Sequence, residues 1–237
     1  MTDRRIDAAI FDLGNTLVAY YRSEEFESIL HASICAIGEE LERGGRSIDV
    51  QHCFSTAQNL NRESEDGRVW PLADRLTELL GSEIASGSSM DALIDAFLSP
   101  IFATARIDPQ AIAVLETLRA NGINTAIVSN TPWGSPGNRW RDELARLGLL
   151  KHIDAAVFCV DVGWRKPASA PFSHAMSLLK VLPQHTVFIG DDPVWDIEGA
   201  QRVGIEPILL SKRDHSDQSV TTIGELEQLL PLILSNR

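Results

Sequence analysis

The chain has 237 residues, of which 44% are hydrophobic and 23% are charged, so its composition is that of a folded globular protein and excludes a disordered chain. Its formal net charge of −12 makes nucleic acid a poor partner, because such binding needs clustered lysines and arginines. An anionic substrate would be repelled at long range, so attraction would have to come from a local site such as a metal ion or helix N-termini.

Five short, mostly apolar runs predict strands that are buried on both faces of a sheet. They span residues 8–12, 125–129, 155–160, 186–190 and 207–210. Helix-like segments alternate with them at 111–120, 140–147, 171–181 and 194–203, and a final helix is expected to start at Thr222 with Glu225 completing a capping box. This alternation predicts an α/β fold with a Rossmann-like parallel sheet and helices on both faces.

The first strand is followed by a long segment of a different kind. More than 90 residues separate it from the helix start at Pro109. Apolar residues recur there at three- and four-residue spacing, which is typical of amphipathic helices; they include Phe26, Ile29, Leu30, Ile34, Ile37, Leu72, Leu76, Leu79 and Leu80. We therefore expect a helical domain over residues 19–105, inserted into a core formed by residues 1–18 and 106–237.

Carboxylates follow two of the predicted strands. Asp12 ends the first, and Asp191, Asp192 and Asp196 follow the strand at 186–190. Three carboxylates within six residues repel one another unless a cation lies among them, and hard cations such as Mg²⁺ take oxygen ligands of this kind. Asp192 precedes Pro193 and is first interpreted as the N-cap of the next helix, whereas Asp191 and Asp196 have no such simple structural role.

Two further strand ends carry polar residues. Ser129 and Asn130 end the second run, where a hydroxyl and backbone N–H groups can hold a phosphate, and Lys166 follows the third run. Each signal is weak by itself. In a sheet of order 3-2-1-4-5, however, all these strand ends share one edge, and Asp12 and Asp191 flank the topological switch point where such folds bind ligands.

The order of these motifs resembles the haloacid dehalogenase-like hydrolase superfamily. The matching residues run through nearly the whole chain: Asp12-Leu13-Gly14-Asn15-Thr16, Ser129-Asn130-Thr131, Lys166-Pro167, and Gly190-Asp191-Asp192 through Asp196 to Glu198-Gly199-Ala200. The resemblance implies that the helical insertion is a cap domain of the type placed between the first and second motifs.

The resemblance also implies roles. Asp12 would be the nucleophile that accepts a phosphoryl group. Mg²⁺ would be held by Asp12, Asp191 and the backbone carbonyl of Gly14. Asp196 would support these ligands without contacting the ion directly, or would bind a metal-bound water. Ser129, Asn130 and Lys166 would hold the transferring phosphate, and Lys166 would also restrain the Asp12 carboxylate. The implied activity is a Mg²⁺-dependent phosphohydrolase that acts on a small soluble phosphate ester through an aspartyl phosphate.

Gly14 departs from the pattern of the family's phosphatases, which usually place a second Asp there as acid and base. Losing a positioned acid–base group typically costs about 10²–10⁴-fold in rate. Two alternatives therefore stay open: a haloacid-dehalogenase-type hydrolase, and a binding or regulatory protein with weak catalysis. The dehalogenase branch needs no Mg²⁺, so the complete Asp191 and Asp196 pair argues against it.

Aromatic and arginine side chains near these motifs are candidates to select the substrate. They are Tyr20, Tyr21, Arg22, Arg68, Trp70, Trp133, Arg139 and Trp140. Such side chains can hold a sugar or a base, although Trp70 and Trp140 are also interpreted as packing residues.

The sequence also bears on location. No apolar run approaches the ~18–20 residues of a membrane span, and Asp12 cuts off the apolar stretch that a secretory signal would need. Cys35, Cys53 and Cys159 are too far apart for a CxxC metal site and odd in number for a disulfide framework. We therefore expect a cytoplasmic protein with no membrane or nucleic-acid partner; no pattern indicates its oligomeric state.

Overall fold

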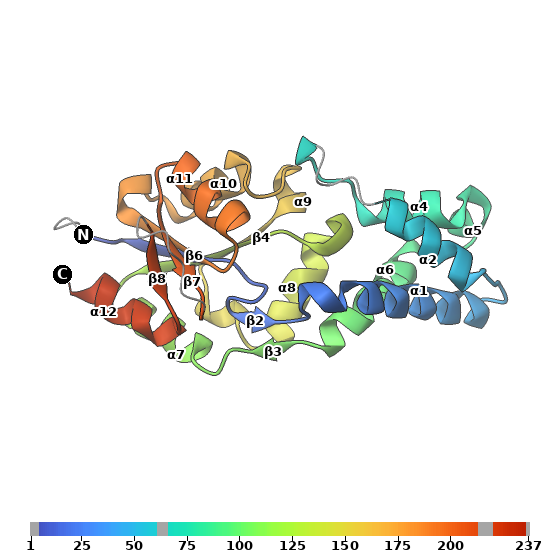
Figure 1. Cartoon of the computed structure of the whole chain (residues 1–237), viewed down its shortest axis with the longest axis horizontal. Coiled ribbons are helices and arrows are strands. Elements are labelled where there is room, and N and C mark those ends of the chain that lie inside the picture. Colours follow the sequence, from blue (N-terminus) through green and yellow to red (C-terminus); the bar gives the residue numbers. More distant parts are fainter. Residues whose placement is uncertain (1–4, 61–65, 213–219, 236–237) are drawn as a thin grey trace.

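A computed structural model describes residues 5–60, 66–212 and 220–235. Its main sheet has six parallel strands in the order β5-β4-β1-β6-β7-β8 (Figure 1). The strands are β1 (Ala8–Phe11), β4 (Asn124–Ser129), β5 (Ala155–Phe158), β6 (Thr186–Gly190), β7 (Glu206–Leu210) and β8 (Thr221–Ile223). The parallel α/β fold is confirmed, and the five predicted strands follow the predicted order.

The sixth strand corrects the prediction at the C-terminal end. Thr222 lies within β8 and pairs with Leu209 of β7, so it does not begin a helix. The β-branched residues of this segment suit a strand at the edge of a sheet. Glu225 and Gln228 form the capping box instead, ahead of α12 (Leu229–Leu234).

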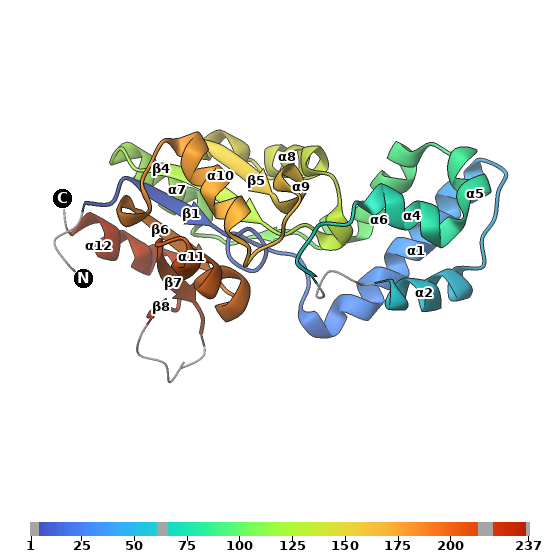
Figure 2. The same ribbon diagram turned by 90° about the horizontal axis from the view of Figure 1, so that it is seen from above.

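Helices cover both faces of the sheet (Figure 1 and Figure 2). The side chains of β1 point alternately to one face and to the other, so each face needs a layer of helices to bury them. Ala8 and Ile10 pack with one buried cluster, together with α10 (Ser169–Leu179) and α11 (Gly199–Arg202). Ala9 and Phe11 pack with the other, together with α7 (Ala111–Ala120), α8 (Gly137–Arg146) and α12. The central strand is therefore buried on both sides, as its continuous apolar run predicts.

Between β1 and β4 the chain forms a helical body at the other end of the molecule (Figure 1). A short antiparallel pair, β2 (Val18–Ala19) with β3 (Arg106–Ile107), lies where the chain leaves the sheet and returns to it. The helices of this body are α1 (Phe26–Arg43), α2 (Val50–Asn59), α4 (Leu72–Leu80), α5 (Ser82–Ser86) and α6 (Met90–Ala103). No helix among the described residues combines the length and the apolar character needed to cross a bilayer.

The remaining elements are short turns at the ends of these strands and helices. They are α9 (Cys159–Val162), η1 (Ser23–Glu25), η2 (Pro132–Gly134), η3 (Leu150–His152), η4 (Pro183–His185), η6 (Leu226–Gln228) and the π-helical turn η5 (Pro193–Glu198).

One close contact between the helical body and the sheet domain involves Arg75. The buried Arg75 guanidinium of α4 lies 5.1 Å from the Trp70 ring centroid and 5.3 Å from that of Trp133, which follows β4. Beside Trp133, Gly134 has φ +63°, and a Cβ there would overlap the Trp70 carbonyl oxygen. Only glycine therefore fits this contact without displacing the backbone of the helical body.

We predict that Gly134→Ala lowers the free energy of unfolding by more than Gly148→Ala does. Gly148 has φ +75° but open space where a Cβ would lie, so its substitution costs only the left-handed backbone term of about 1–2 kcal/mol. Gly134→Ala adds a steric clash worth about a further 1–3 kcal/mol. Urea unfolding of both variants measures the difference; equal costs would contradict the close contact.

Candidate active site

Asp12 lies at the carboxyl end of the central strand. Its backbone N–H donates to the Ile189 carbonyl at 2.8 Å, which extends the ladder between β1 and β6 by one residue. The chain then turns sharply, with Asn15 at φ +58°, a conformation that asparagine tolerates better than most residues. The Asp12 side chain is thereby held at the sheet edge, and the residue is only 6% exposed.

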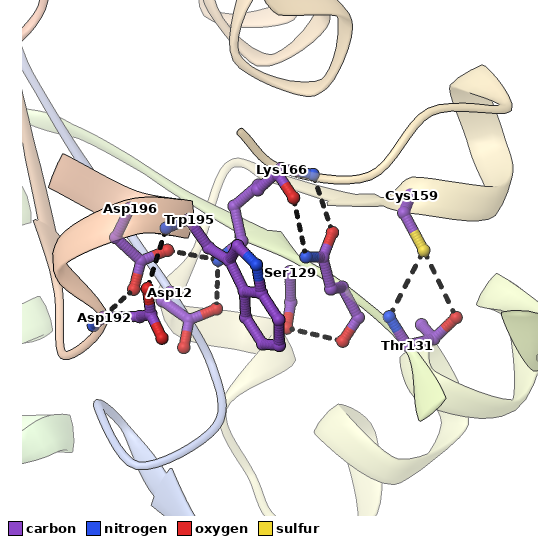
Figure 3. A network of polar contacts seen from close by, with 9 residues as sticks. Asp12, Ser129, Thr131, Cys159, Lys166, Asp192, Trp195 and Asp196 are labelled. Carbon is purple, nitrogen blue, oxygen red and sulfur yellow. Dashed lines mark hydrogen bonds and ion pairs between the residues drawn. The ribbon is translucent and has the colours of Figure 1, made fainter. Parts of the chain in front are cut away.

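Lys166 brings a buried positive charge to Asp12. Its Nζ donates to Asp12 Oδ1 at 2.5 Å and to Asp196 Oδ1 at 2.6 Å (Figure 3). Burial by itself lowers the pKa of this lysine, but the attraction of the two carboxylates outweighs burial and raises the pKa well above its usual range. The ammonium group therefore stays charged near neutral pH.

The backbone of Lys166 is fixed by Asn130. The Asn130 Oδ1 accepts from the Lys166 N–H at 2.8 Å, and its Nδ2 donates to the Lys166 carbonyl at 3.2 Å. One side chain at the end of β4 thus positions the loop that carries the lysine. This contact was not evident from the sequence, because the two residues are 36 positions apart.

The loop after β6 positions the other carboxylates. Asp192 Oδ1 accepts from the N–H groups of Val194 and Trp195, both at 2.8 Å, which confirms its expected capping role. Asp196 Oδ2 accepts from the Asp192 N–H at 3.1 Å, so hydrogen bonds occupy both Asp196 oxygens. A Cβ on Gly190 would overlap Asp196 Oδ2, so a glycine is required for this close approach.

Asp191 completes an acidic cluster. Carboxylate oxygens of Asp12, Asp191 and Asp196 all lie within 4.8 Å of one another. Burial, with the negative charges of Asp12 and Asp196, raises the pKa of Asp191 to about 7. Burial likewise raises the pKa of Asp196, while Lys166 opposes that shift. One ammonium group does not balance three carboxylates, so this arrangement favours a further cation.

The other expected site residues lie around this cluster. Ser129 is the last residue of β4 and is 6% exposed, with its hydroxyl 3.4 Å from the Asn130 carbonyl. Gly14 follows Asp12 by two residues and forms a bridge with Val18. A Cβ added to Gly14 would meet no atom within 4 Å. The loop therefore has room for a Cβ at position 14, where the family's phosphatases usually have an aspartate.

Several candidate substrate residues instead pack inside the protein. Trp140 is 4% exposed and its Nε1 donates to Ser135 at 2.8 Å. Trp133 is 3% exposed and lies 5.5 Å from Phe97, centroid to centroid. Arg139 bonds Asp91 and Asp95 on α6. The contacts of Trp133 and Arg139 join the helical body to the sheet domain.

Two residues near the cluster were missed by the sequence analysis. Arg165 donates to the Thr131 carbonyl at 3.0 Å, and its guanidinium lies 6.0 Å from the Trp195 ring centroid. Trp195 is 48% exposed and stands before Asp12 and Ser129 in Figure 3. A tryptophan next to a motif aspartate was a usable signal. Its contact with Arg165 was not, because it depends on the packing of two loops.

Comparisons with known proteins agree with this geometry. The chain is 28% identical over 94% of its length to ribulose-1,5-bisphosphate 5-phosphatase of Halopiger xanaduensis, and the match covers 98% of that protein. Its fold is similar to that of a HAD phosphatase from Thermococcus onnurineus, with TM-score 0.66, 23% identity and coverage of 96% and 98% of the two chains. It is also similar to that of a 2-haloacid dehalogenase from Pseudomonas syringae, with TM-score 0.68, 22% identity and coverage of 97% and 98%.

A family model described as haloacid dehalogenase-like hydrolase matches residues 6–204. This range contains every strand end that contributes to the cluster, from Asp12 to Asp196. The chain therefore belongs to the haloacid dehalogenase-like hydrolase family.

Proposed function

We propose that this protein is a Mg²⁺-dependent phosphohydrolase that acts on a small phosphate ester through an aspartyl phosphate on Asp12. The observation that carries the proposal is the buried Asp12 carboxylate, held by Lys166 within an acidic cluster. A nucleophile and a phosphate, both negative, can approach each other only if nearby positive charge offsets their repulsion. The phosphatase-named relative that matches nearly the whole chain supports this choice of reaction.

In this mechanism a carboxylate oxygen of Asp12 forms a bond to phosphorus while the bond to the ester oxygen breaks, and the departing oxygen takes a proton from water because Gly14 supplies no acid. Lys166 restrains the carboxylate through Oδ1 and adds positive charge beside the phosphoryl group. Ser129 contacts the phosphate from the end of β4, and Asn130 contributes by holding the Lys166 backbone. Water then cleaves the aspartyl phosphate, which releases inorganic phosphate and restores Asp12.

The residues present fit a Mg²⁺ ion. The structure records no hydrogen bond or ion pair from the Asp191 carboxylate to any residue within the described ranges, although its neighbours are other carboxylates. Asp12, Asp191 and the Gly14 carbonyl would hold the ion, while Asp196 supports Lys166 and the loop backbone. When bound, Mg²⁺ supplies the positive charge that lets Asp12 approach a phosphate.

Residues 19–105 act in this proposal as a cap that shapes the space for the substrate. The inserted helices and the sheet domain meet through residues that follow β4, which also supplies Ser129. A small phosphorylated metabolite, such as the sugar phosphate in the name of the Halopiger relative, fits a site between two such parts.

The first test is hydrolysis of p-nitrophenyl phosphate with Mg²⁺. We expect Mg²⁺-dependent turnover that a chelator abolishes, and a loss of at least about 10³-fold in Asp12→Asn, whose amide is not a competent nucleophile. Asp7→Asn, at a half-exposed position before β1, is the matched control. Turnover that survives both the chelator and Asp12→Asn would refute the mechanism, and metal-free turnover of haloacids would support a dehalogenase.

We next predict that Lys166→Met abolishes activity and lowers the free energy of unfolding by about 3–5 kcal/mol, because two buried carboxylates lose their counter-charge. Adding Asp196→Asn should recover part of the stability but not the activity. Chemical denaturation measures the first effect and phosphate release the second. A Lys166→Met protein as stable as the wild type would show that the ion pairs do not support the fold.

We further predict that Gly14→Asp supplies the missing acid–base group. The backbone of Gly14 is not left-handed and its surroundings are open, so Gly14→Asp introduces the missing acid without strain. The wild type should hydrolyse aryl phosphates much faster than alkyl phosphates, and the variant should speed alkyl phosphates by about 10²-fold or more. Asn15→Asp makes the same change in charge at an exposed neighbouring position and is the control. An unchanged dependence on leaving-group pKa would mean that another group already donates the proton.

A further inference from the structure

The loop that carries Lys166 also carries a second positive charge, the Arg165 guanidinium. Arg165 lies directly before the lysine in sequence and donates to the carbonyl of Thr131, two residues past Ser129. Its guanidinium also lies 6.0 Å from the ring centroid of Trp195, which directly precedes Asp196. It therefore bridges the loops that follow β4 and β6, the two strands that flank β1 and Asp12.

Trp195 is an exposed aromatic side chain near the site. It is 48% exposed, whereas Trp133 and Trp140 are almost completely buried. Its backbone N–H is held by Asp192, so the indole is presented from a fixed turn. An exposed aromatic ring on a fixed backbone offers apolar surface to the carbon skeleton of a ligand at low entropic cost.

The positive rim continues outward from Arg165. Gly67 accepts from the Arg165 N–H at 2.8 Å, and the Val69 N–H donates to Gly163 at 3.0 Å. This pairing places the Arg68 guanidinium 5.0 Å from the Trp164 ring centroid. Within the described part of the chain, the structure records no ion pair for Arg68. Two arginines and two exposed tryptophans thus lie on the loops next to the catalytic lysine.

The charge of these arginines matters because the rest of the molecule opposes an anion. The net charge of the chain is −12, and the site itself contains three clustered carboxylates. A guanidinium stays charged at all relevant pH values and binds phosphate or carboxylate oxygens in a bidentate way. Arginines on the loops next to Lys166 therefore favour substrates that carry negative charge beyond the ester phosphate.

We propose that Arg165 and Trp195 form a second subsite, which binds an anionic group, phosphate or carboxylate, on the leaving-group side of the substrate. The Arg165 guanidinium contacts the anionic group, and the Trp195 indole contacts the carbon skeleton between that group and the ester. This inference rests on the proposed phosphohydrolase activity. It predicts that the substrate carries two anionic groups, as bisphosphates and phosphorylated carboxylic acids do.

The test uses two pairs of ligands that differ by one anionic group: fructose 6-phosphate with fructose 1,6-bisphosphate, and glycerol 3-phosphate with 3-phosphoglycerate. Binding is measured by calorimetry in the presence of Mg²⁺ on the Asp12→Asn background, so that no ester is hydrolysed. We expect the doubly anionic member of at least one pair to bind about 10-fold more tightly or better, the size of one charge-assisted hydrogen bond. The pair that shows the preference identifies phosphate or carboxylate as the recognised group.

Adding Arg165→Gln should abolish this preference, and Arg165→Lys should restore part of it, which a merely structural role for Arg165 would not produce. Trp195→Ala should weaken binding of both members of a pair. Arg202→Gln removes an exposed arginine paired with Glu198 and should leave the preference unchanged. Equal binding within both pairs, a preference that survives Arg165→Gln, or no binding at all would overturn the subsite.

Wild-type turnover of p-nitrophenyl phosphate separates this inference from the proposed function. Turnover without a preference between the paired ligands would refute the subsite alone. A preference that depends on Arg165, in a protein without turnover, would refute the hydrolase mechanism and leave the subsite as a binding site.

Discussion

The site depends on one buried ammonium group shared between two carboxylates. Lys166 reaches Asp12 at the end of the central strand and Asp196 in the turn after the neighbouring strand. Moving an isolated charge out of water is costly, so each of these groups is tolerated at this depth only because the others are present. The ion pairs thereby join three loops at the carboxyl edge of the sheet into a single arrangement.

The surrounding contacts keep this arrangement in place. Asn130 holds the lysine backbone from the end of β4, and the N–H of Asp192 occupies the second oxygen of Asp196. Gly190 leaves the space into which the Asp196 carboxylate fits. Asp191 alone is left without a protein partner among the described residues of the cluster, and burial, with the charges of Asp12 and Asp196, raises its pKa. Asp12 and Asp196 are held by hydrogen bonds, whereas the Asp191 carboxylate is not. This difference favours a metal ion as the partner of Asp191.

The helical body is fixed to the edge of the sheet that carries the acidic cluster. Arg75 between Trp70 and Trp133, and Arg139 on α8 against α6, fix one side of the body to the loop after β4. The pairing of Gly67 with Arg165 fixes a second point beside the lysine loop. In the proposed mechanism, the same loops therefore hold the catalytic residues and contact the helical body.

The sequence by itself predicted five of the six strands, their order and the polar residues that follow them, because buried parallel strands are continuous apolar runs and their polar ends meet at one side. Asp12, Lys166 and Asp191 became candidate site residues in this way. The predicted helix start at Thr222 was wrong, because Thr222 pairs with Leu209 of β7 and belongs to a strand. Only the tertiary structure decided which side chains serve one another: Asn130 holds Lys166, and Arg165 lies against Trp195. Such contacts join residues from separate loops, and no periodicity in the chain records how those loops pack.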